Sequence, residues 1–211
     1  MKRLLSILVA IAMLFSLTAC GGPNESDEEL LAIVEALCEE SILVNRLIFG
    51  DGILTKENGK KIGTYTEADA ASLADFGVDD VEDVEDITAS VYSLAVCAWI
   101  KKTVLSSEKS EADGVVLTYA RYYVGEVENE DGEKEEIFLV HTSYTKTVGD
   151  ASYGNYRISE KKKNVVTFLL DITVTHKGQS KVYTDQKVTI YKEAHGWRLD
   201  TPTYATYGDA S

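Results

Sequence analysis

The residue types that carry catalysis are scattered through this sequence. The three histidines, His141, His176 and His195, lie far apart, and none belongs to an HExxH arrangement. His141 stands mid-strand beside Ile137 and Leu139, so it faces either a pocket or the packed sheet. The chain has no GxSxG elbow and no GxxxxGK phosphate loop. We therefore expect no enzyme activity and no cofactor.

Two acidic stretches offer oxygen ligands of the kind that calcium prefers. They run over residues 75–86 and 126–136. Within the first, apolar residues recur every third position from Val78 to Ile87, which is a helical spacing, and no EF-hand glycine stands at the sixth position. We interpret the first stretch as the acidic start of a helix and the second as a solvated hairpin tip, and we expect no metal site.

Tyrosines are frequent in the second half of the chain. Tyr119, Arg121 and Tyr123 alternate along one expected strand and so share one face of it. We predict that these three residues and Asp171 line the mouth of a pocket, where tyrosines make adaptable contacts with a ligand. The alternative is that strand propensity alone explains the tyrosines.

The N-terminus has the pattern of a signal peptide. Lys2 and Arg3 precede an apolar run from Leu4 to Leu17. As a helix this run spans about 21 Å, short of the roughly 30 Å core that a transmembrane helix must cross. The residues that follow, Leu-Thr-Ala-Cys-Gly-Gly, resemble the bacterial lipobox. This resemblance implies that Cys20 becomes the first residue of the mature chain and carries acyl chains, palmitate among them, that hold it on the bilayer.

The formal net charge of the chain is −14, and removal of Lys2 and Arg3 with the signal peptide makes it −16. Such a surface repels nucleic acid and anionic lipid headgroups, so contact with the bilayer runs through the lipid. Cationic partners, metal ions and basic wall polymers remain compatible with it. We expect an exported protein at the extracytoplasmic face of the cell membrane.

Two further cysteines, Cys38 and Cys97, lie inside apolar helical patterns. An even pair in an exported protein is compatible with a disulfide. The alternative, which we favour, is two buried thiols that behave as small hydrophobic residues.

The expected elements place helices first and strands second. Apolar spacing predicts helices over 28–49, 66–76 and 81–105, with Gly50 and Gly77 as stops and Asn58-Gly59 as a turn that leaves room for a short hairpin. Strands are expected over 115–127, 137–148, 165–176 and 181–193, followed by a turn at Gly196, and they form an antiparallel meander. This order predicts an α+β fold with N-terminal helices packed on one curved, cone-like antiparallel sheet.

The domain organisation follows from these elements. We expect a lipoprotein signal peptide over 1–19, a tether linker over 20–27 and a single α+β domain over 28–211, helical over 28–108 and β-rich over 114–207.

Two phrases resemble those of cell-surface lipoproteins from Gram-positive bacteria: Asn-Arg-Leu-Ile-Phe-Gly-Asp-Gly over 45–52, and His-Gly-Trp-Arg-Leu-Asp-Thr-Pro-Thr-Tyr over 195–204. The second is similar to the last strand of domains like nuclear transport factor two (cystatin-like). The resemblance implies a cone-shaped domain and carries over no catalytic residue, because that fold hosts both enzymes and binding modules.

We therefore expect a membrane-tethered, non-enzymatic binding or interaction module whose partner is an envelope protein or a small ligand. One alternative is an inhibitor of a cell-wall peptidase, suggested by export and by Val-Glu-Asp-Ile over 84–87. Another is a wall or glycan hydrolase acting from two carboxylates. A solute-capturing lipoprotein is disfavoured by the length of the chain.

Overall fold

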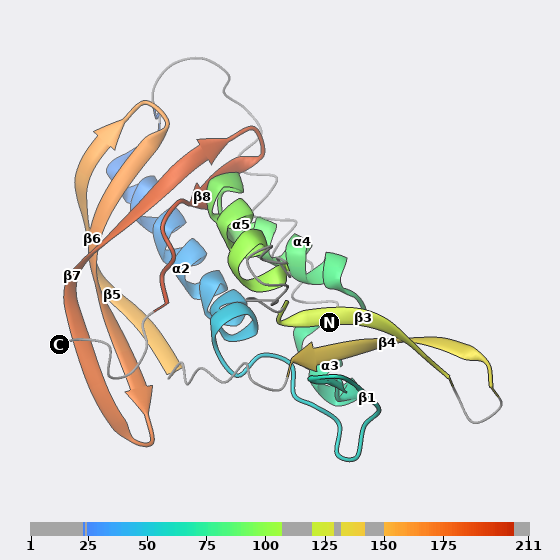
Figure 1. The fold of residues 1–211 in the computed structure, drawn as a ribbon. Coiled ribbons are helices and arrows are strands. Elements are labelled where there is room, and N and C mark those ends of the chain that lie inside the picture. Colours follow the sequence, from blue (N-terminus) through green and yellow to red (C-terminus); the bar gives the residue numbers. More distant parts are fainter. Residues whose placement is uncertain (1–22, 24, 107–119, 129–131, 142–149, 205–211) are drawn as a thin grey trace, which may run out of the picture.

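The protein has an α+β fold, in which helices fill most of the first half and strands most of the second (Figure 1). The structure, a computed structural model, describes residues 23, 25–106, 120–128, 132–141 and 150–204. In chain order the elements are α2 (Asp27–Phe49), β1 (Lys61–Ile62), β2 (Tyr65–Glu67), α3 (Ala70–Phe76), α4 (Val81–Val91), α5 (Leu94–Ile100), a π-helix η1 (Lys101–Leu105), β3 (Tyr122–Glu128), β4 (Lys134–His141), β5 (Asp150–Lys162), β6 (Val165–His176), β7 (Gln179–Glu193) and β8 (Gly196–Leu199).

Helix α2 is the central element, and its ends are set by local sequence. Ser26 and Glu29 form a capping box: the Glu29 amide donates to the Ser26 hydroxyl, and the Ser26 amide donates to the Glu29 carboxylate at 2.7 Å. Gly50 ends the helix, so the helix expected over 28–49 is confirmed. One face of α2 is buried along its whole length, from Leu30 to Phe49, which makes this helix the spine of the core.

The helix expected over 81–105 is not continuous, which corrects the sequence prediction. It breaks at Tyr92 and Ser93 into α4 and α5 and then continues as the π-helix η1. The Ser93 amide donates to the Leu199 carbonyl at 2.8 Å, and its hydroxyl donates to Asp200 at 2.5 Å while accepting from the Val96 amide. The end of β8, far along the chain, thus forms hydrogen bonds with Ser93 at the break. Apolar periodicity does not predict this contact.

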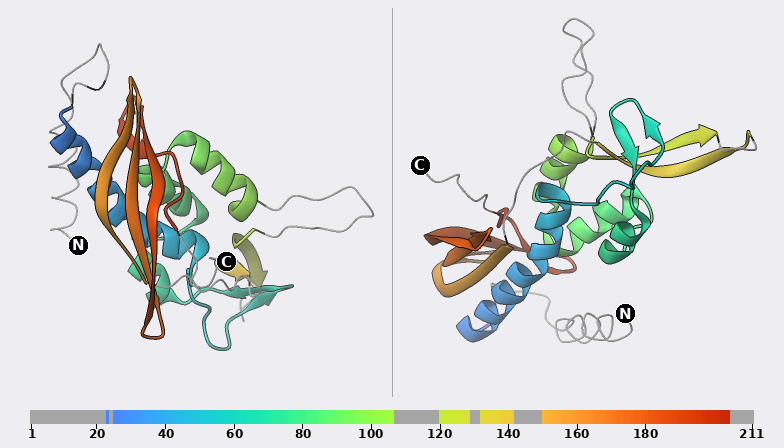
Figure 2. Two further views of the ribbon diagram at one scale, coloured as in Figure 1. Left: turned by 90° about the vertical axis from the view of Figure 1, so that its left-hand side faces the viewer. Right: turned by 90° about the horizontal axis from the view of Figure 1, so that it is seen from below.

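Strands β5 to β8 form one antiparallel sheet in the order β5-β6-β7-β8. The sheet is strongly curled, and α2 lies along its concave side (Figures 1 and 2). Alternate residues of β6 from Val166 to Val174 point inward and are buried against α2. Lys177 and Gly178 adopt positive φ angles of 49° and 76° in the β6–β7 turn, as expected for a tight hairpin.

The remaining strands form a second, separate sheet in the order β1-β2-β4-β3. This is another correction, because a single sheet was expected. β2 comes from the helical half of the chain, yet it pairs with β4, and Tyr65 lies opposite His141. The sheet packs at the C-terminal end of α2, and its β3–β4 hairpin projects away from the helices (Figure 1). The Asn58-Gly59 turn exists, but the β1–β2 reversal follows it at Gly63 and Thr64.

The main hydrophobic core joins α2 to the concave face of the curled sheet and to α4 and α5. Every residue of this cluster lies between Leu30 and Tyr204. A chain that begins at Gly21 therefore keeps every residue of this cluster. Within the part of the chain that the structure describes, no helix combines the length and apolarity needed to cross a membrane.

Candidate functional site

Arg121, one of the residues predicted to line a pocket, is buried at the end of α2. Its guanidinium donates to the carbonyl oxygens of Ile48 at 2.7 Å and Gly50 at 2.5 Å. These carbonyls lie at the helix C-terminus, where the helix dipole favours a cation. Arg121 precedes β3, in a bend, so the alternation of strand side chains does not govern its direction. Its role is to join the second sheet to the end of α2.

Tyr123 lies on the outer face of the β1-β2-β4-β3 sheet, and its side chain is 48% exposed. The ring centroids of Tyr123 and Tyr65 are 5.7 Å apart, and those of Tyr65 and His141 are 5.0 Å apart, edge to face. His141 is buried, and burial lowers the pKa of its imidazole. Three strands thus bring two tyrosines and a histidine together into an aromatic patch that sequence reasoning missed, because it needs the pairing of β2 with β4.

Asp171 lies in the other sheet, at an irregularity that helps to curl it. Asn155 and Asp185, on the flanking strands, have positive φ angles of 55° and 54° next to shifts in strand register. The Asp171 carboxylate accepts from the Asn155 side chain at 2.7 Å and from the Asp185 amide at 3.0 Å. These hydrogen bonds lower its pKa. Asp171 therefore stabilises the irregular stretches of the two strands that flank it.

The predicted pocket mouth is accordingly not assembled from its four residues. Tyr119 lies outside the described residues. Arg121 is buried at a helix end, Tyr123 lies on an outer sheet face, and Asp171 belongs to the other sheet. The prediction assumed one sheet whose alternation continues through Arg121, and neither assumption holds in the structure.

A buried polar network joins α2 to β5, to the break before α5 and to the C-terminal segment. The Thr203 hydroxyl lies 2.6 Å from the Ser41 hydroxyl and accepts from the Asn45 amide at 2.9 Å. The Tyr92 hydroxyl donates to the Asn45 side-chain carbonyl at 2.6 Å, and the Tyr153 hydroxyl lies 3.4 Å from polar side-chain atoms of Ser41, Asn45 and Thr203. Burial raises the pKa of Tyr92, so the phenol stays protonated and keeps donating. The network holds the C-terminal segment against α2.

An open groove lies between α4 and α5, with a volume of about 270 Å³. Its apolar lining consists of Ala89, Leu94, Cys97, Ala98, Ile100 and Leu105. The alanines are exposed, and their small side chains leave the space between the two helices. Leu94, at the rim, is 72% exposed, so this large apolar side chain contributes little to the packing of the protein's own core. We call this feature the α4–α5 groove.

The rim of the α4–α5 groove is polar, and it is positioned by the helix break at Ser93. Glu85 and Asp86 line the α4 side, and Lys101 comes from the opposite side. The Lys101 ammonium lies 2.8 Å from Glu85, in an ion pair whose side chains are 59% and 38% exposed. Because the break folds α5 back beside α4, residues 16 positions apart in sequence face each other across the groove.

Cys97 is the one groove residue whose type suggests nucleophilic chemistry. Burial, and to a lesser extent the Glu193 carboxylate, raise the pKa of its thiol to about 11. The thiol donates to the Tyr92 carbonyl at 3.4 Å. Cys38 is buried in α2, and burial raises its thiol pKa to about 12. Both cysteines of the described ranges are free thiols, as we favoured, but only Cys38 is buried and Cys97 is half-buried. Their raised pKa values keep both thiols protonated at neutral pH.

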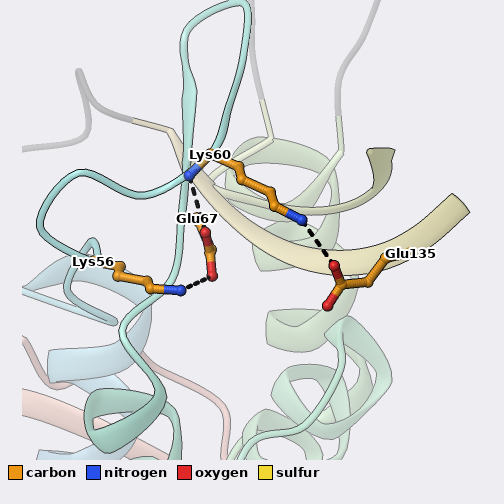
Figure 3. Close-up of polar contacts among 4 residues, drawn as sticks. All are labelled: Lys56, Lys60, Glu67 and Glu135. Carbon is orange, nitrogen blue, oxygen red and sulfur yellow. Dashed lines mark hydrogen bonds and ion pairs between the residues drawn. The ribbon is translucent and has the colours of Figure 1, made fainter. Parts of the chain in front are cut away.

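An ion-pair ladder crosses the outer face of the second sheet (Figure 3). The Glu67 carboxylate accepts from the Lys56 ammonium at 2.5 Å and from the Lys60 amide at 2.9 Å. The Lys60 ammonium in turn lies 2.8 Å from Glu135 on β4. The hydrogen bond from Lys56 lowers the pKa of Glu67. The ladder fastens the turn before β1 to β2 and β4, and its charges are satisfied within the chain.

Among the residues that the structure describes, no three His, Cys, Asp or Glu side chains come together as a metal site. Compared with models of known protein families and with curated protein sequences, the chain matches none. Two small residues, Ala89 and Ala98, and the large Leu94 line the α4–α5 groove. Their positions in the sequence indicate a groove only once the helix is known to break between Ala89 and Leu94.

Proposed function

We propose that the protein is an extracytoplasmic lipoprotein, held on the cell membrane by acylated Cys20, whose domain is a non-enzymatic interaction module. The lipobox-like segment before Cys20 supports the anchor. The curled sheet around α2 supports the comparison with domains like nuclear transport factor two. The protein would then present a binding surface to a neighbouring component of the envelope.

The observation that carries this proposal is the α4–α5 groove. Its volume of about 270 Å³ lies below the range of roughly 300–1,000 Å³ that is typical of pockets for whole small molecules. It suits one or two apolar side chains of a larger partner, and such anchors dominate the binding energy of protein interfaces. The exposed Leu94 extends the apolar surface beyond the groove.

The start of the domain also fits a tethered protein. Burial raises the pKa of Glu25, but hydrogen bonds from Lys192 and Trp197 outweigh that effect and lower it. These bonds, of 2.7 Å and 3.1 Å, fix the chain to the curled sheet just before α2 begins. From Cys20 to Glu25 the chain spans at most about 17 Å, so the domain would sit close to the bilayer.

The test is a pull-down from detergent-solubilised cell envelope. The bait is the chain from Gly21 onward, with an Ala98→Trp variant that fills the α4–α5 groove and an Ala74→Trp variant that adds the same side chain on exposed α3. We expect one stoichiometric envelope protein with the wild-type and Ala74→Trp baits, and its loss with Ala98→Trp. Recovery of the same proteins by all three baits, or of none by any, would overturn the groove as the interaction site.

A further inference from the structure

The α4–α5 groove lies in the acidic part of a molecule whose charge is unevenly distributed. Residues 25–106, which form the helical layer and the β1–β2 hairpin, contain 18 acidic and six basic side chains. Residues 150–204, which form the curled sheet and the C-terminal segment, contain six acidic and nine basic side chains. A cationic partner is therefore attracted to the helical side and repelled from the sheet side.

We infer that the α4–α5 groove binds a cationic amphipathic helix of a partner protein, with an apolar side chain of that helix inserted between Ala89 and Ala98. This inference rests on the proposed function and names the chemistry of the partner. The apolar lining sets the requirement for an apolar anchor, and the Glu85 and Asp86 carboxylates on the α4 side of the rim set the requirement for flanking lysines or arginines.

The geometry of the walls favours a helix as the occupant. Both walls of the groove are helices, α4 and α5, and side chains of a third helix pack well into the channel between two others. On such a helix, basic residues three or four positions from the apolar anchor lie on its flanks and reach the rim. Glu85 and Asp86 lie on that rim, one turn before Ala89.

The ion pair at the rim leaves the acidic groups available to a partner. The Glu85–Lys101 pair is exposed on both sides, and exposed pairs contribute little to stability. An incoming lysine or arginine therefore replaces Lys101 at small cost.

The test uses two designed 18-residue helical peptides with the same leucine stripe, one with lysines and the other with glutamates on the polar face. Fluorescence anisotropy measures their affinity for the chain from Gly21 onward at physiological salt. The protein variants are Ala98→Trp, Ala74→Trp as the matched control, and the charge-reversed pair Glu85→Lys with Asp86→Lys.

We expect the lysine peptide to bind the wild type and Ala74→Trp equally, to bind Ala98→Trp at least tenfold more weakly, and to lose affinity for the charge-reversed protein, which gains affinity for the glutamate peptide. Equal binding of the lysine peptide to all variants would reveal unspecific charge attraction and overturn the inference. So would binding of neither peptide, or tighter binding of the glutamate peptide to the wild type. If the pull-down nevertheless yields a groove-dependent partner, the interaction function stands and only the stated chemistry of the partner is wrong.

Discussion

The Asn45 side chain forms hydrogen bonds with four other side chains of the buried polar network. It donates to Thr203 in the C-terminal segment and accepts from Tyr92 at the break between α4 and α5. One amide on α2 therefore ties together two segments that are distant in sequence. Buried groups of this kind are stabilising while satisfied, and their removal leaves partners without hydrogen bonds in a region from which water is excluded.

Replacing Asn45 with Ala should lower the free energy of unfolding by about 1–3 kcal/mol, because the hydroxyls of Tyr92 and Thr203 lose their amide partner. Urea denaturation followed by circular dichroism measures the change. Asn164→Ala, at an exposed position of the turn between β5 and β6, serves as the control and should cost less. A loss below about 0.5 kcal/mol for Asn45→Ala, the range of ordinary surface substitutions, would show that the network does not stabilise the fold.

The thiol of Cys97 gives a residue-scale prediction that depends on pH. Its pKa is raised to about 11 by burial, so the thiolate is a small fraction of the population at neutral pH. Iodoacetamide should label Cys97 slowly at pH 7 and about tenfold faster for each added pH unit, because only the thiolate reacts. Mass spectrometry gives the rates, and Cys97→Ser identifies the background from Cys38. A half-maximal rate near pH 8.5, as in a free cysteine, would contradict the burial of this thiol.

The joint between α2 and the second sheet is the clearest case of one element positioning another. The Tyr122 hydroxyl donates to the Leu47 carbonyl at 2.6 Å and accepts from the Ile53 amide at 3.2 Å. Arg121 caps the same helix end. Gly52 allows this close approach because its φ is +64°, and a Cβ atom there would lie 2.1 Å from the Arg121 guanidinium.

Gly52→Ala and Gly63→Ala form a matched pair that separates crowding from backbone strain. Both glycines have positive φ, but a Cβ atom at Gly63 would meet nothing within 4 Å. Gly63→Ala should cost about 1–2 kcal/mol through the left-handed backbone alone. Gly52→Ala should cost about 3 kcal/mol or more, because Arg121 and Tyr122 must also move. Equal losses in urea denaturation would mean that the joint is loosely packed.

For the molecule as a whole, α2 sets the distance between the proposed anchor and the second sheet. With 23 residues it is about 35 Å long at 1.5 Å per residue. The anchor would lie at its N-terminal end, where Glu25 is fastened to the curled sheet, and the aromatic patch of the second sheet lies at the opposite end. With Cys20 acylated as proposed, the β3–β4 hairpin would point away from the bilayer.

Cys20→Ala should transfer the protein from the detergent-rich to the aqueous phase in a Triton X-114 partition of expressing cells, because the change removes the proposed acylation site. Intact mass should show loss of the acyl chains. Cys97→Ser keeps Cys20 and should remain in the detergent phase. An unaltered partition of Cys20→Ala would refute the lipid anchor while leaving the groove proposal untouched.

Sequence by itself determined what is local along the chain. The capping box at Ser26 and the stop at Gly50 define α2, and Lys177-Gly178 defines the β6–β7 turn, because each is decided by neighbours within a few residues. Apolar periodicity likewise gave the α+β class and β6 with its bounds. It missed β5, whose residues are mostly polar because one strand edge and one face are open to solvent.

Only the tertiary structure decided how these elements meet. Two sheets rather than one arise because β2, from the helical half, pairs with β4, and strand pairing between distant segments has no signature in either segment alone. The break at Ser93 depends in the same way on Leu199, which lies more than a hundred residues later. The α4–α5 groove exists because of that break. The candidate binding surface therefore depends on hydrogen bonds between segments far apart in sequence, and these form only when the chain folds.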